Sequence, residues 1–102
     1  MGRRVRDARL DTREARLKLK ALHEPYWRLI HEGLHLGYRK GSRGGSWIVR
    51  VSHEGKYRKD AFASADDQED ANGKTILSFA QAQAEAIKRA KTIIKEDPDE
   101  GP

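Results

Sequence analysis

Basic side chains are the residues of this sequence whose type and spacing point to a chemical role. They recur through three short runs between Gly33 and Phe62, and Arg50 stands in the middle run, directly after Trp-Ile-Val. Arginine can donate paired hydrogen bonds to a phosphate or to a base edge, whereas lysine acts on phosphates as a point charge. The pattern indicates a polyanionic partner, and a merely solvated basic surface is the plain alternative.

Period-two alternation sorts these side chains onto one face of a predicted sheet or into its turns. Arg50 is expected to reach base edges from the central strand, with Ser52 beside it, while Lys40, Arg43 and Lys56 at the turns are expected to meet phosphates. The candidate DNA-binding residues are His35, Arg39, Lys40, Arg43, Arg50, Ser52, Lys56, Tyr57 and Lys59.

The residues that catalysis or metal binding would need are not spaced for either. The four histidines are scattered, with no metal-type pair at helical spacing. The sequence contains no Gly-x-Ser-x-Gly turn, and the glycines of 41–45 lack the Gly-Lys-Ser/Thr of a phosphate-binding loop. The acidic residues of 66–70 do not have calcium-loop spacing. We therefore expect no enzymatic activity, no cofactor, no metal and no small-molecule substrate.

Composition limits the chain to one small domain. It has 102 residues, of which 36% are hydrophobic and 36% charged, and it contains no cysteine. No apolar run approaches the roughly 20 residues that cross a membrane, and no apolar segment follows the basic N-terminus as in a secretory signal. We expect a cytoplasmic protein with no membrane partner.

The net charge of +5 is unevenly distributed along the chain. Residues 1–20 carry eight Lys or Arg against three Asp or Glu, and residues 21–60 carry eight against four. Residues 61–102 reverse the balance, with five against nine. The polyanion is therefore expected to bind the first two segments.

The N-terminal part predicts an arm, a short helix and an aromatic cluster. Residues 1–10 are interpreted as a flexible basic arm. Asp11 is expected to cap a short helix, with Glu14 bonding back to it, and the helix should end before Pro25. The apolar group at 26–30, which includes Trp27, is expected to form a lid over a small core, and stacking on bases is the alternative.

Three alternating runs between 33 and 62, separated by glycine-rich turns, predict an antiparallel meander. Leu34, Leu36 and Tyr38 should share the buried face with Trp47, Val49 and Val51. Residues 40–46 are expected to form a mobile basic hairpin tip, and Glu54-Gly55 a tight turn. Phe62 should be buried, but the register of the third strand stays open.

The C-terminal part predicts an acidic loop at 63–74 and the best helix of the chain. Ser78 and Gln81 form a capping box, and Phe79, the alanines at 82, 86 and 90, and Ile93 or Ile94 make one apolar stripe. The helix should end near Asp97-Pro98. Residues 96–102 are interpreted as an acidic linker or truncation point.

Together these elements predict an α+β fold: a three-stranded antiparallel sheet packed on one C-terminal α-helix, with a short N-terminal helix and flexible ends. Residues 11–95 are expected to form the single domain. The helix should cover the apolar face and leave the basic outer face to solvent.

The order of these motifs resembles the N-terminal part of bacterial and phage tyrosine recombinases, the site-specific integrases. The resemblance covers most of the chain and rests on Gly-Leu-His-Leu-Gly-Tyr-Arg-Lys-Gly at 33–41, Gly-Ser-Trp-Ile-Val-Arg at 45–50, Ala-Asp-Asp at 65–67 and Leu-Ser-Phe-Ala-Gln-Ala at 77–82. The corner departs from the family, with Phe-Ala-Ser at 62–64 where Leu-Gly-Thr is usual.

The resemblance implies a domain that binds arm-type DNA sites with its sheet in the major groove. It also implies a parent recombinase of a mobile element that integrates and recombines DNA, whose catalytic domain is absent from this chain. Double-stranded DNA is the expected partner, along with neighbouring integrase subunits. The alternatives are a protein-interaction domain that contacts a recombinase subunit, and a module resembling double-stranded-RNA-binding domains.

Overall fold

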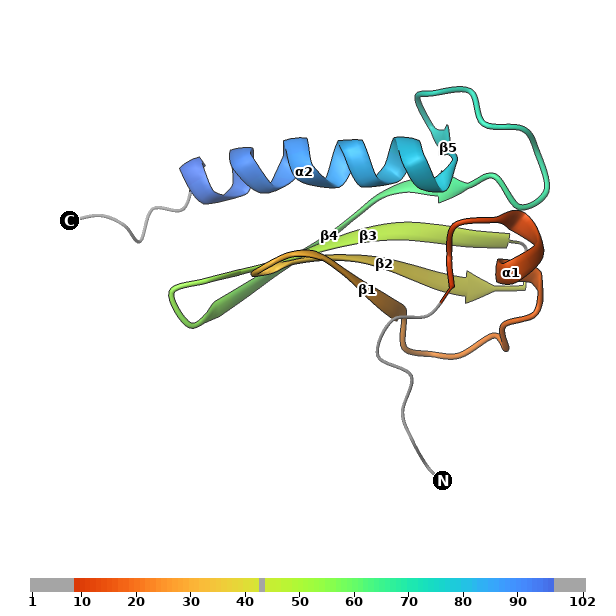
Figure 1. The fold of residues 1–102 in the computed structure, drawn as a ribbon, viewed down its shortest axis with the longest axis horizontal. Coiled ribbons are helices and arrows are strands. Elements are labelled where there is room, and N and C mark those ends of the chain that lie inside the picture. Colours follow the sequence, from red (N-terminus) through yellow and green to blue (C-terminus); the bar gives the residue numbers. More distant parts are fainter. Residues whose placement is uncertain (1–8, 43, 97–102) are drawn as a thin grey trace.

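The structure is a computed structural model that describes residues 9–42 and 44–96. The elements are α1 (Arg13–Leu17), β1 (Tyr26–His31), β2 (Leu34–Gly41), β3 (Gly44–His53), β4 (Lys56–Ala65), β5 (Ile76–Leu77) and α2 (Phe79–Glu96). The predicted α+β class is confirmed, because α2 lies along one side of a curled sheet (Figure 1). Neither of the described helices has the length and apolar character needed to cross a bilayer.

The sheet has five strands, so the prediction of three was wrong. The strands follow the order β1-β2-β3-β4-β5, with β1 to β4 antiparallel and the two-residue β5 parallel to β4. β1 contains the aromatic cluster that we expected to form a lid, and it pairs with β2 starting from Tyr26 opposite Tyr38. The predicted meander is therefore the centre of a wider, mixed sheet.

The apolar face of the sheet is the one that alternation predicted. Its fully or almost fully buried side chains are Leu34, Leu36, Tyr38, Trp47, Val49 and Val51. The buried alanines of α2 face this surface, and the small side chains let the helix sit close to it. The predicted capping box is also present, because the Ser78 amide donates to Gln81 Oε1 (3.1 Å) and the Gln81 amide donates to Ser78 Oγ (3.2 Å).

A bulge sets the register of β4, which the sequence left open. The pairing between β3 and β4 shifts between Trp47 and Ile48, and Phe62 is the extra residue at that point. Toward the hairpin turn the ladder is regular, and Arg50 pairs with Lys59. Cross-strand partners share a face, so the bulge places the basic side chain of Lys59 beside that of Arg50.

The two central hairpins have short turns. The prediction of a tight turn at Glu54-Gly55 is confirmed, because both residues adopt positive φ angles of 53° and 79°, as a two-residue hairpin turn requires. The first hairpin is tighter than the predicted tip at 40–46, since Gly41 pairs with Gly44. Likewise the acidic loop is shorter than 63–74, because β4 continues to Ala65.

Arg16 links α1 to the acidic corner that follows β4. Its side chain is 1% exposed and pairs with Asp66 and with Asp67 (2.9 Å to Asp67), and it donates to the carbonyl of Leu10 (2.9 Å). Leu10 is itself fully buried. The predicted arm at 1–10 therefore extends too far at its C-terminal end; residues 1–8 lie outside the described part of the chain.

The helix cap at α1 also differs from the prediction. Thr12, rather than Asp11, is the N-cap, and its hydroxyl accepts from the amide of Ala15 at 3.0 Å. Asp11 instead pairs with Arg9 at 3.3 Å. A hydrogen bond to its own backbone amide lowers the pKa of Asp11, and the pairing with Arg9 adds to this. The helix begins one residue later than predicted, and it is short, as expected.

Candidate nucleic-acid interface

The outer face of the sheet, turned away from α2, is the candidate interface. By alternation and register it carries Trp27, Leu29, His35, Gly37, Arg39, Ile48, Arg50, Ser52, Tyr57, Lys59 and Ala61. Neither Asp nor Glu occurs among these strand positions. The strands therefore present only cationic or neutral side chains on this side, which gives the face a single sign of charge.

Arg50 lies at the centre of the outer face, between two aromatic rings. Its guanidinium carbon is 4.2 Å from the centroid of the Trp27 ring and 5.4 Å from that of Tyr57. Trp27 comes from β1 and Tyr57 from β4, so the rings approach Arg50 from opposite sides of β3. Such contacts hold a guanidinium by cation–π attraction and restrict its rotamers.

Gly37 makes this arrangement possible. Trp27 pairs with Gly37 across β1 and β2, and a Cβ placed on Gly37 would lie 2.5 Å from Cζ3 of the indole. The indole therefore lies flat across β2, where any side chain on Gly37 would displace it. The same indole also makes an edge contact with His35, with ring centroids 6.4 Å apart.

Arg50 has no neutralising partner among the described residues. Its Nε atom is buried and has no hydrogen-bond acceptor there. Two other arginines differ: Arg16 pairs with Asp66 and Asp67, and Arg89 with Asp60 and Glu85. A buried donor without an acceptor is destabilising, and because Nε is enclosed, the terminal nitrogens of Arg50 are the atoms left to bond an external ligand.

The remaining predicted residues of the outer face lie around Arg50. Arg39, Ser52, Tyr57 and Lys59 are exposed, and His35 is half-buried. Arg39 and Lys59 also border a hollow of about 310 Å³, together with Ile48, and two acidic residues, Glu24 and Asp60, line the same hollow. The structure thus brings these predicted residues onto one surface, and their role in DNA binding stays a prediction.

Lys40 is placed differently from the prediction. Its ammonium group donates to the carbonyls of Arg16, Leu17 and Leu19 at 3.0, 2.9 and 2.8 Å. These carbonyls are the acceptors at the C-terminal end of α1 and just beyond it. Since lysine has three donors, a phosphate contact by Lys40 would break one of these bonds, and its observed role is structural.

Of the other two predicted turn residues, Lys56 lies off this face and Arg43 is not described. Lys56 is exposed at the β3–β4 turn but pairs with His53, so it belongs to the opposite face from Arg50. Arg43 lies outside the described residues. The strand positions, rather than the turns, therefore carry the candidate interface.

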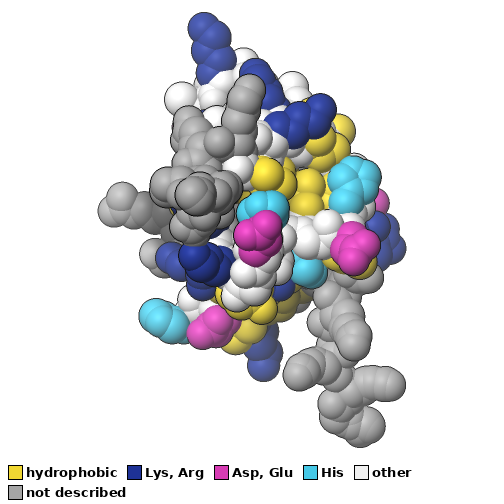
Figure 2. Space-filling model, turned by 90° about the vertical axis from the view of Figure 1, so that its left-hand side faces the viewer, with side chains coloured by type: hydrophobic (Ala, Val, Ile, Leu, Met, Phe, Trp, Pro, Cys, Tyr) yellow, Lys and Arg dark blue, Asp and Glu magenta, His cyan; other side chains and the backbone are white. Residues whose placement is uncertain are grey.

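At the end of the sheet where the β1–β2 and β3–β4 hairpins turn, side chains of both charges occur. Figure 2 shows the end at which the β1–β2 and β3–β4 hairpins turn, and acidic, basic and histidine side chains are interspersed there with hydrophobic ones. Glu32 and Glu54 are exposed at these turns. A polyanion would therefore be attracted to the face of the sheet more than to its end.

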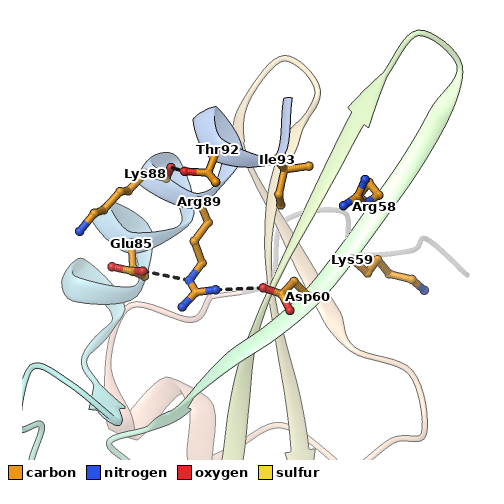
Figure 3. Close-up of a pocket in the computed structure, with 8 residues that line it drawn as sticks. All are labelled: Arg58, Lys59, Asp60, Glu85, Lys88, Arg89, Thr92 and Ile93. Carbon is orange, nitrogen blue, oxygen red and sulfur yellow. Dashed lines mark hydrogen bonds and ion pairs between the residues drawn. The ribbon is translucent and has the colours of Figure 1, made fainter. Parts of the chain in front are cut away.

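A second depression lies between α2 and β4, on the side opposite Arg50. It has a volume of about 480 Å³, and Arg89 reaches across it to Glu85 (2.9 Å) and Asp60 (3.0 Å), as Figure 3 shows. Both carboxylates thereby pair with the same guanidinium. This groove ties the helix to β4, and it offers a weaker case for a ligand than the outer face.

Sequence reasoning did not find the part played by Trp27 and Gly37. Trp27 was expected to cover a core, yet it lies on the outer face against Arg50. A usable signal was present, because a glycine within a strand often marks a close approach of another group. Among the described residues, no three or more His, Asp or Glu side chains are grouped to hold a metal ion.

No protein-family model, curated protein or solved structure matches this chain.

Proposed function

We propose that this chain binds double-stranded DNA by inserting the outer face of its sheet into the major groove. The observation that carries the proposal is Arg50: a guanidinium held between two rings at the centre of a sheet face whose own strand positions carry no Asp or Glu, with Nε lacking an acceptor among the described residues. A charge held in this way loses little side-chain entropy on binding.

The dimensions of the face support this proposal. Neighbouring strands lie about 4.8 Å apart, so the basic side chains of β2, β3 and β4 span about 10 Å. The major groove is about 12 Å wide and admits β-structure. His35, Arg50 and Lys59 are cross-strand partners in one row, so all three can face the floor of the groove together.

The proposal includes the parentage that the motifs suggest, a tyrosine recombinase that recombines DNA at specific sites. What supports it is the order of the motifs along the fold: 33–41 covers β2, 45–50 lies in β3, 65–67 forms the acidic corner and 77–82 opens α2. Sequencing the DNA that follows codon 102 tests the parentage. A downstream domain with an arginine pair, histidines and a tyrosine nucleophile is expected, and its absence would remove the parentage without touching DNA binding.

Binding to duplex DNA is tested by fluorescence anisotropy with a labelled random-sequence 25-mer duplex across a salt series. We expect the logarithm of the binding constant to fall linearly with the logarithm of salt, with a slope of about −0.9 per phosphate neutralised. Arg50→Ala should weaken binding at least several-fold, while Lys91→Ala, which removes an exposed cation from α2, should not. Equal effects of the two substitutions would show that only total charge matters.

A protein-interaction role is the second candidate, and the edge of β4 favours it. β5 pairs only with Ser64 and Ala65, so the part of β4 from Tyr57 to Phe62 has no neighbouring strand on that side among the described residues. Unpaired edges can accept a strand from another chain. Self-association in sedimentation experiments, without affinity for duplex DNA, would favour this reading. Stronger competition by duplex RNA than by duplex DNA would instead indicate an RNA-binding module.

A further inference from the structure

Three of the polar side chains of the outer face are hydrogen-bond donors only, while His35, Ser52 and Tyr57 can donate or accept. Arg39, Arg50 and Lys59 donate and cannot accept. The strand positions of this face include no Asp, Glu, Asn or Gln. Such a face can satisfy bases that offer acceptors, but it lacks the carboxylates and carboxamides that accept a hydrogen bond from a base amino group.

The four bases differ in this respect within the major groove. Guanine presents two acceptors, N7 and O6, whereas cytosine presents an amino donor, and adenine presents one acceptor and one amino donor. A face of donors therefore discriminates in favour of guanine. Arg50 is the donor with the geometry for it, because its fork can bond N7 and O6 together.

The ring contacts also determine which nitrogens of Arg50 can donate a hydrogen bond to a base. Trp27 and Tyr57 approach the guanidinium from opposite sides of β3, at 4.2 and 5.4 Å. Nε is buried, so the terminal nitrogens are the donors left for a base. Gly37 acts as a positioning residue, because its missing side chain lets the indole reach Arg50.

Tyr57 places an apolar surface directly beside this donor. Its side chain is 67% exposed, although its ring lies against Arg50. In the major groove, the C5-methyl group of thymine is the partner of such a surface. A base that neighbours the guanine under Arg50 would come within reach of the Tyr57 ring.

We propose that the recognised DNA contains a guanine next to a thymine, with Arg50 bonding N7 and O6 of the guanine and Tyr57 contacting the thymine methyl. This inference rests on the proposed DNA binding and adds the identity of the bases.

The test begins with selection of bound sequences from a random duplex library by the full chain. The selected duplex is then resynthesised with 7-deazaguanine at each guanine, or with deoxyuridine at each thymine, and titrated by anisotropy. We expect one 7-deazaguanine to weaken binding about tenfold, within the usual range for an arginine–guanine pair, and one neighbouring deoxyuridine about threefold, as for the loss of one buried methyl group. These base changes leave the protein unaltered, so no folding defect can imitate the result.

Three variants then assign the contacts. Arg50→Lys keeps the charge but loses the fork, and it should remove most of the sensitivity to 7-deazaguanine. Tyr57→Phe keeps the ring and should retain the sensitivity to deoxyuridine, while Tyr57→Ala should lose it. Circular dichroism checks that each variant is folded, and Lys91→Ala serves as the control for charge.

The outcomes separate this inference from the function on which it rests. Salt-dependent binding that is indifferent to every 7-deazaguanine would overturn the base assignment and leave DNA binding in place. Sensitivity that persists unchanged in Arg50→Lys would transfer the contact to another residue and refute the role of Arg50. No binding to any duplex would overturn both proposals.

Discussion

Replacing Arg16 by methionine should destabilise the domain more than any other single change to a charged residue described above. Methionine fills a similar volume but removes the charge that faces Asp66 and Asp67. It also removes the donor to the Leu10 carbonyl and the cation that lies 5.2 Å from the Trp47 ring and 5.8 Å from the Tyr38 ring. The two carboxylates, whose side chains are 15% and 8% exposed, would then lack their main counter-charge.

The expected loss of stability in Arg16→Met follows from the burial of the ion pairs that Arg16 makes. Removing one partner of a buried ion pair typically lowers the free energy of unfolding by about 3–5 kcal/mol. A domain of this length has a total stability of roughly 5–15 kcal/mol. With a urea dependence of about 2 kcal/mol per molar, the unfolding midpoint of Arg16→Met should fall by about 2 M.

The assay is urea denaturation followed by tryptophan fluorescence, since Trp47 is fully buried. Arg89→Met is the matched control, because Arg89 also contacts two carboxylates but its side chain is 40% exposed. Exposed pairs contribute less than about 1 kcal/mol, so the control should lose little. Adding Asp66→Asn and Asp67→Asn to Arg16→Met should recover part of the loss. A change below about 1 kcal/mol in Arg16→Met would refute the reasoning.

Three further predictions concern the contact of Gly37 with Trp27, the phenol of Tyr38 and the turn at Glu54. Gly37→Ala should lower the free energy of unfolding by about 1–3 kcal/mol and alter the fluorescence of Trp27, because the new methyl overlaps the indole; an unchanged urea midpoint would contradict this. Burial and the bond to Asp67 raise the pKa of Tyr38 above its usual 10.0. The folded state therefore keeps a proton that the unfolded state releases, so wild-type stability should fall as the pH rises above about 10. Tyr38→Phe should lack this contribution, as urea midpoints at pH 9 and pH 11 would show. Glu54→Asn should raise the free energy of unfolding by about 0.5–1 kcal/mol, because Glu54 has a φ of 53° that asparagine tolerates better. A lower melting temperature in thermal unfolding would contradict this.

Local pattern predicted the centre of the fold well. The alternation around Leu36 and Val49 fixed which face is buried, and the capping box at Ser78 fixed the start of α2. These features depend on neighbours in sequence or on regular periodicity. β1 was missed because apolar residues lie on both of its faces, with Tyr26 packed against the core and Trp27 on the outer face.

The features that sequence could not predict depend on partners far along the chain. Arg16 resembled a surface residue of a basic helix, but its carboxylate partners are 50 and 51 residues away. Lys40 resembled a phosphate ligand, but it binds carbonyls at the end of α1. Of the candidate site, the central position of Arg50 was predicted, while its placement between two rings required the path of β1 to be known.

The pairing of Arg16 with the acidic corner has a practical consequence for trimming the N-terminus. Leu10 and Arg16 belong to the packed interior, although they precede the sheet by ten residues or more. A shortened version that starts at Tyr26 would keep every strand and α2, yet it would leave Asp66 and Asp67 without Arg16, their buried counter-charge. Deletions meant to probe the basic N-terminal residues should therefore stop before Leu10, so that loss of affinity is not mistaken for loss of folding.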